Sequence, residues 1–191
     1  ISTFDKQIFK KYIDDYYSPD KVVIAVTGNF EESDMIKKVE SYFGSFERKS
    51  HPDKNSESKY NSCLVTKVKD IEQVHLSLGF PGIEVGSDYS YSLSILNTIF
   101  GSGMSSRLFQ KIREENWLSY SVYSYGNSYK NICVFNIYAG LSANQTEQVL
   151  NLIIAEIKRL FDDRKTEVEL NKTKEHLKSN SLLSLDSSAN R

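Results

Sequence analysis

Cysteine is scarce in this chain, and its placement excludes a fold held together by disulfides. The 191 residues contain two cysteines, Cys63 and Cys133, and neither belongs to a CxxC pair or a cysteine-rich framework. A small secreted disulfide scaffold needs several paired cysteines, so that class is excluded. Cys133 also lies inside an apolar run. We expect both thiols to be free and buried, as in a protein of a reducing, cytoplasmic compartment.

Histidine is equally sparse, and it cannot build a zinc site within this chain. None of the three histidines, His51, His75 and His176, lies three or four positions from another, the spacing that places two imidazoles on one helix face. Glu175 and His176 match the end of an inverted zinc motif, but its first histidine would fall on Lys172. We therefore expect no metal ligand here, and interpret His75 as a packed or edge residue of a strand.

Charge and catalytic motifs narrow the function further. Lys and Arg number 24 against 25 Asp and Glu, so the net charge of -1 gives no sequence-wide attraction to nucleic acid or to an anionic membrane. No apolar run approaches the roughly 18 residues of a membrane span. Neither a Gly-x-Ser-x-Gly elbow nor a phosphate loop is present. These absences predict no nucleic-acid partner, no membrane span and no self-contained hydrolase site.

What the sequence does contain is a regular alternation of helical and strand periods. Helical spacing of apolar residues predicts helices over 4–16, 33–43, 88–100, 105–114 and 146–161, and from 166 onward. Runs rich in β-branched and alternating residues predict strands over 22–28, 63–69, 72–80, 119–125 and 132–140. This order predicts an α+β fold, a mostly antiparallel sheet with helices packed on one face. We expect one domain over residues 1–191, cut from a longer protein.

The stretch Phe100–Tyr125 concentrates the candidate functional residues. Gly101 and Gly103 interrupt two predicted helices, and Ser105 or Ser106 can cap the second of them. This loop follows a helix and lacks a third glycine, so a nucleotide-binding turn is a poor match.

Arg113 and Tyr120 follow that loop, seven positions apart. A tight connection between the short helix and the next strand can bring both side chains to one edge. A guanidinium and a phenol are good donors for a carbonyl oxygen that gains negative charge during acyl transfer. Spacing alone favours the simpler interpretation, a surface ion pair at Arg113 and sheet packing at Tyr120.

The stretch Gly101–Tyr125 closely resembles the signature of the second domain in the pitrilysin or insulinase-like family of zinc metallopeptidases, which includes mitochondrial and bacterial processing peptidases. Members show a Gly-Gly-Gly-Met-Ser-Ser-Arg-Leu-Phe-like loop and helix, then Ile-Arg-Glu, then a Leu-Ala-Tyr-Ser-Val-like strand. The segments Tyr17–Phe30 and Lys174–Arg191 also resemble parts of that domain. The resemblance therefore covers nearly the whole chain.

The resemblance implies a protein larger than this chain. In the family, a first domain carries His-x-x-Glu-His and a distant Glu that bind zinc, and a similar second domain closes over a peptide substrate. This chain resembles the second domain without its last helices, so zinc is expected in the parent and not here. Arg113 and Tyr120 fall on the positions that bind the substrate carbonyl, and Gly101, Gly103 and Ser105 on the adjoining substrate-binding loop.

Two departures from the family pattern matter. Gly101-Ser102-Gly103 is shorter than the glycine run of non-catalytic processing subunits, which favours a cytoplasmic bacterial chain with its own zinc domain. Trp117-Leu-Ser replaces a more usual Gly-Leu-Ala, which puts the alignment of Tyr120 in question. The expected partners are the zinc-binding first domain, a peptide and a second copy in a homodimer. The alternative is a non-catalytic binding or assembly module, or a regulatory subunit of a two-subunit peptidase.

Overall fold

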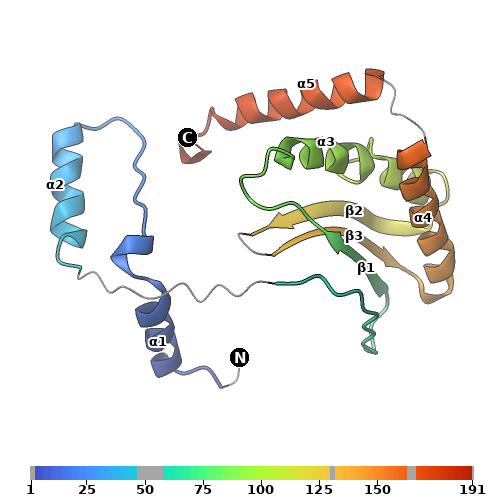
Figure 1. Ribbon diagram of the computed structural model, residues 1–191, viewed down its shortest axis with the longest axis horizontal. Helices are drawn as coiled ribbons and strands as arrows, with labels where there is room; N and C mark the ends of the chain where they lie inside the picture. The colour runs from blue at the N-terminus through green and yellow to red at the C-terminus, as the bar shows by residue number, and fades with distance from the viewer. Residues whose placement is uncertain (1–2, 47–57, 130–131, 163–166, 191) are drawn as a thin grey trace. The chain divides into compact units, whose positions relative to one another are not determined.

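The computed structural model describes residues 3–46, 58–129, 132–162 and 167–190 (Figure 1). Its contacts divide the chain into two compact units, Ile1–Asn55 with Leu182–Arg191, and Ser56–Ser181. The expectation of a single domain over 1–191 stays a prediction. None of the helices in the described ranges has the length and apolar character needed to cross a bilayer.

The first unit contains the helices α1 (Lys6–Tyr16) and α2 (Glu32–Phe43) and the short turns η1 (Pro19–Lys21) and η4 (Ser188–Asn190). Asp5 caps α1, because its side chain accepts a hydrogen bond from the Ile8 N–H at 2.9 Å. Both helices agree with the sequence periodicity. The strand predicted over 22–28 is wrong: that segment is extended but forms no ladder with any described strand, and a β-branched run needs a partner backbone to become a strand.

The second unit is built on a three-stranded antiparallel sheet in the order β1-β3-β2. Its strands are β1 (Val74–Pro81), β2 (Ser119–Ser128) and β3 (Cys133–Leu141). The predicted strands over 72–80, 119–125 and 132–140 are confirmed with small shifts of their ends. The strand predicted over 63–69 is wrong, since this segment pairs with no described strand and Val68 is 98% exposed.

Neither of the two cysteines is fully buried. Both cysteines are free, but Cys63 is exposed and Cys133 is half-buried, with its thiol donating to the Tyr129 carbonyl at 3.2 Å. The prediction that both thiols are buried is therefore wrong, because 63–69 does not join the sheet and Cys133 lies at the end of β3.

Helices cover one face of this sheet, which confirms the predicted α+β class. The unit contains α3 (Ser90–Phe100), the π-helical turn η2 (Phe109–Glu114), η3 (Ala143–Gln145), α4 (Thr146–Asp162) and α5 (Glu167–Ser184) up to Ser181. Figure 1 shows α3 lying across the sheet and α4 beside it. Alternation along the strands sends every second side chain toward these helices.

The core lies between this sheet face and the helices. It consists of Phe100, Leu108, Ile112, Leu118, Val122, Phe135, Ile137, Ala139, Leu141, Val149 and Ile153. Burying each large apolar side chain contributes about 1.5–3 kcal/mol relative to leaving it exposed. Three of these residues, Leu108, Ile112 and Leu118, flank the candidate site, so the core fixes its backbone.

Candidate functional site

The helix that carries Arg113 ends in a widened turn. Leu108 and Ile112 are fully buried and anchor it to the core, as the apolar spacing predicts. From Phe109 to Glu114 the helix is π-helical, with the Glu115 N–H donating to the Gln110 carbonyl at 2.9 Å. The periodicity predicts an ordinary helix here and gives no sign of the extra residue in the turn. Such π turns occur frequently at functional sites.

A left-handed residue closes this helix. Trp117 has φ 56°, and its N–H donates to the Arg113 carbonyl at 3.1 Å. A second hydrogen bond encloses the first one along the chain: the Leu118 N–H donates to the Ile112 carbonyl at 3.0 Å. The nested pair resembles a Schellman cap with one additional residue, as a π turn requires. Glycine is the usual residue at such a position, which explains the glycine in the family's Gly-Leu-Ala.

Tyr120 lies in a β-bulge at the start of β2. Ser119 pairs with Leu141 and Ser121 with Gly140, so Tyr120 has no cross-strand partner. The Ser119 hydroxyl lies 2.7 Å from the Gly140 carbonyl oxygen and stabilises this irregular register. A bulge redirects the side chain of its extra residue, and Tyr120 is 75% exposed.

The π turn and the bulge together bring Arg113 and Tyr120 into contact. Arg113 Nη1 donates to the Tyr120 carbonyl oxygen at 2.9 Å. Its Cζ atom lies 4.6 Å from the Tyr120 ring centroid and 4.8 Å from the Phe109 ring centroid. The half-buried guanidinium is therefore held by cation–π contacts with two rings. No carboxylate of the described residues forms an ion pair with Arg113, so the surface ion-pair alternative is not observed.

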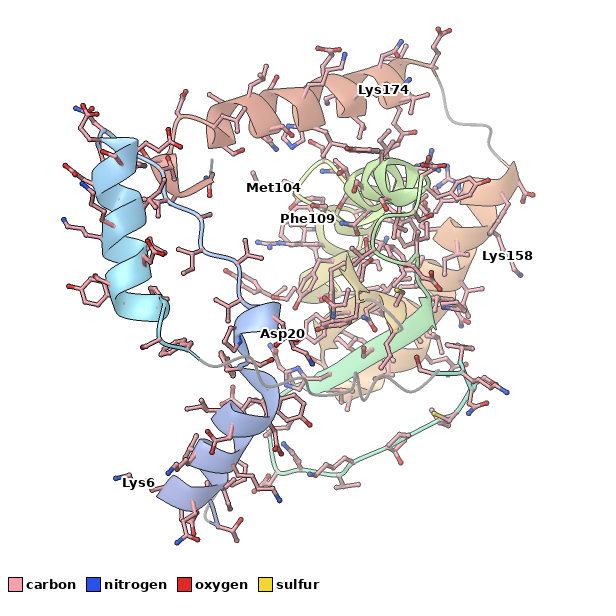
Figure 2. All side chains as sticks on the ribbon, turned by 60° about the vertical axis from the view of Figure 1, so that its left-hand side comes forward. Lys6, Asp20, Met104, Phe109, Lys158 and Lys174 are labelled. Carbon is pink, nitrogen blue, oxygen red and sulfur yellow. The ribbon has the colours of Figure 1, made fainter. Side chains whose placement is uncertain are left out.

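The adjoining loop is tied to the same helix but not to the pair. Gln110 Nε2 donates to the Met104 carbonyl at 2.7 Å, and Figure 2 labels Met104 on the loop and Phe109 on the turn that follows. Gly103 has φ 98° and is exposed, as is Ser105. Ser106, not Ser105, is buried at the loop's end, where its hydroxyl donates to the Gly103 carbonyl at 2.7 Å.

Gly101 has a packing role in the structure. A Cβ at this buried position would overlap the backbone nitrogen and side chain of Ser124 on β2. The Ser124 N–H donates to the Gly101 carbonyl at 3.1 Å, and its hydroxyl donates to Asn97 Oδ1 at 2.6 Å. Within the described ranges, Gly101, Gly103 and Ser105 form no hydrogen bond with Arg113 or Tyr120. Gly101 thus joins the end of α3 to the sheet, and the substrate-binding role predicted for this loop stays a prediction.

The described residues of this chain do not fit a zinc ion. The described part of the chain holds no group of three His, Cys, Asp or Glu side chains that could bind a metal. His75 Nδ1 lies 2.7 Å from the Tyr138 hydroxyl on the sheet face away from the core, and His176 Nε2 lies 3.1 Å from Asn180 Nδ2 on α5. His51 is outside the described residues.

The α+β unit, with helices on one sheet face, thus carries the Arg113–Tyr120 contact, and its described residues include no cluster that could bind a metal. The family described as "Peptidase M16 inactive domain" matches residues 3–177, and the chain belongs to this family.

Relatives and solved structures agree with this assignment. The chain is 42% identical to the uncharacterized zinc protease YmxG of Bacillus subtilis, over 98% of this chain and 46% of the relative. It is 34% identical to an uncharacterized zinc protease of Rickettsia bellii, over 94% of this chain and 43% of the relative.

Two solved structures share the fold. A protease from Helicobacter pylori matches with a TM-score of 0.89 and 21% identity, over 99% of this chain and 48% of that one. The peptidase M16 inactive domain from Pseudomonas fluorescens matches with a TM-score of 0.77 and 22% identity, over 93% and 43%. The chain thus spans less than half the length of each of these two relatives and two structures.

Proposed function

We propose that this chain is the substrate-clamping second domain of a zinc-dependent metalloendopeptidase. Arg113 and Tyr120 bind the carbonyl oxygen of a peptide whose cleavage depends on a zinc site in an upstream domain of the same protein. The observation that carries the proposal is the Arg113–Tyr120 contact, in which a bulge and a π turn present two donor side chains together.

The geometry suits recognition of a carbonyl oxygen that gains charge. A guanidinium has five N–H donors, and one of Arg113's is used on the Tyr120 carbonyl. The rings of Phe109 and Tyr120 hold the guanidinium in place, which lowers the entropy lost when its other donors bind a peptide. The exposed Tyr120 side chain offers a phenol from the same edge.

The remaining parts of the proposal concern the parent protein. The zinc-binding first domain and a peptide are its partners, with a homodimer as a further expected assembly. We place the protein in the bacterial cytoplasm, and the zinc proteases of Bacillus and Rickettsia among its relatives support the bacterial origin. Processing of a peptide is the activity expected of the whole protein.

The first prediction tests the pair in the full-length parent. Tyr120→Phe and Arg113→Lys should each lower kcat for peptide cleavage about 10²–10³-fold, the usual effect of losing one donor to a developing oxyanion. Zinc content and melting temperature of the Tyr120→Phe variant should stay at the parent's values, because the ring and its contact with Arg113 remain.

Tyr91→Phe is a matched control, since Tyr91 is also a largely exposed tyrosine, at 82%. It removes one hydroxyl on α3 and should leave kcat unchanged. Full activity in both Tyr120→Phe and Arg113→Lys would contradict the proposal.

A non-catalytic assembly module is the second candidate, and one observation favours it. Arg113 donates a hydrogen bond to the Tyr120 carbonyl and makes cation–π contacts with two rings, and these interactions also stabilise the bulge. A module of this kind predicts that Arg113→Ala lowers the melting temperature and that the parent cleaves no peptide. The presence or absence of His-x-x-Glu-His upstream in the parent gene distinguishes the two candidates directly.

A further inference from the structure

Trp117 combines exposure with an unfavourable backbone conformation. It is the chain's single tryptophan, and its side chain is 82% exposed. Among the described residues it is the one non-glycine residue with positive φ, at 56°. A bulky side chain rarely occupies this region, and strain of this kind clusters at functional sites.

The fold does not account for the indole. The hydrogen bond to the Arg113 carbonyl uses the Trp117 backbone N–H, which glycine would supply equally well. The side chain buries little surface in this chain and therefore contributes little to the stability of the core. An indole kept on a strained turn without a contact that stabilises the fold indicates a contact outside the chain.

Trp117 lies on the turn that joins the two proposed carbonyl donors along the chain. Trp117 lies between Arg113 and Tyr120 in sequence and is hydrogen-bonded to the first of them. The donors recognise main-chain oxygen, which every peptide carries, and therefore confer no side-chain preference. Leu118, the next apolar residue, is buried in the core. Trp117 is thus the large apolar side chain that this turn presents to solvent.

The geometry points to Trp117 as a specificity-determining residue that contacts a bulky apolar peptide side chain flanking the scissile bond. The inference rests on the proposed function and names its substrate class: peptides with large apolar residues at the cleavage site. Aromatic surfaces favour such partners because they bury apolar area at low conformational cost.

The test uses the full-length parent and two peptides that differ only in the residues flanking the scissile bond, Leu-Leu against Ala-Ala. Mass spectrometry confirms that both are cut at the same bond. The parent should prefer the Leu-Leu peptide in kcat/KM. Trp117→Gly should lower that preference roughly tenfold, the usual effect of losing an apolar subsite contact. Trp117→Phe should retain most of it.

Melting temperature gives a second readout. Trp117→Gly should melt several degrees above the parent, because glycine relieves the left-handed strain. A lower melting temperature would mean that the indole stabilises the fold, and the inference would be wrong. Tyr91→Ala, at a position that is also 82% exposed, is the control and should change neither selectivity nor turnover.

The outcomes separate this inference from the proposed function. If Arg113→Lys and Tyr120→Phe slow cleavage but Trp117→Gly leaves the preference unchanged, the donors act as proposed and the role of Trp117 is wrong. An equal fall for both peptides in Trp117→Gly would assign the indole to a contact with another domain and also overturn the inference. If the parent cleaves neither peptide, both ideas fail.

Discussion

At the scale of single residues, two positions conventionally occupied by glycine behave in opposite ways. Gly101 is required because the end of α3 approaches β2 too closely for any side chain. Position 117 needs a left-handed backbone, and the chain places tryptophan there. Glycine at position 101 permits close packing, whereas tryptophan at position 117 lowers the stability of the turn beside the candidate site.

Gly101→Ala should destabilise the protein by about 1–3 kcal/mol, the usual penalty of overpacking, because the new methyl group overlaps the Ser124 backbone nitrogen. Chemical denaturation measures the change. Gly126→Ala is the control: its Cβ would meet only the Leu93 side chain, at 3.6 Å, and stability should change by less than about 0.5 kcal/mol. Equal stability of the two variants would contradict the packing role of Gly101.

At the scale of elements, a half-buried ion pair joins α5 to the start of the helix that carries Arg113. Arg107 Nε and Nη2 donate to the two carboxylate oxygens of Glu169 at 3.2 and 2.8 Å. The side chains are 19% and 31% exposed, so solvent screens the pair less than a surface pair. This contact gives the arginine of the Met-Ser-Ser-Arg-Leu-Phe segment a partner that no sequence pattern identifies.

A double-mutant cycle of Arg107→Met and Glu169→Gln should therefore give a coupling energy of about 1 kcal/mol or more. The control cycle uses Glu175 and Lys178 on α5, an ion pair whose side chains are 71% and 67% exposed. Its coupling should be near zero to about 0.5 kcal/mol. If the two cycles give the same coupling energy, the Arg107–Glu169 ion pair does not stabilise the contact between α5 and the helix that carries Arg113.

Some of the strands that the sequence patterns predict are present in the structure, and others are not. The strands near 119–125 and 132–140 are predictable because their apolar alternation matches one buried face. The segments 22–28 and 63–69 are also rich in β-branched residues but form no ladder among the described residues, because strand pairing is not a local property. The choice of Arg113 and Tyr120 as candidate site residues rests on the family resemblance, because their spacing alone favours a non-functional interpretation. The bulge at Tyr120 depends on the register between β2 and β3, and the π turn at Arg113 depends on one extra residue in a helical turn. The periodicity of apolar residues predicts neither feature.

At the scale of the whole molecule, the proposed function assigns peptide recognition to this chain and the metal centre to another part of the protein. It spans 46% of the Bacillus relative, and its described residues hold no cluster that could bind a metal. Recognition and metal chemistry would then lie on different parts of one larger protein, so each can be removed separately.

Chelation tests this division. EDTA should leave the melting temperature of the isolated chain unchanged, because the described residues hold no cluster through which a metal could contribute to the folding free energy. The same treatment should abolish peptide cleavage by the full-length parent, and added zinc should restore it. A chelator-induced fall in the melting temperature of the isolated chain would show a metal site within it.

Since its single tryptophan lies on the turn between Arg113 and Tyr120, this chain carries its own optical probe. Every photon that its indole emits comes from that turn, without a label and without a background from the core. An indole in water emits at longer wavelength than one in apolar surroundings. A blue shift in its emission would therefore report, in real time, the moment at which the turn is covered.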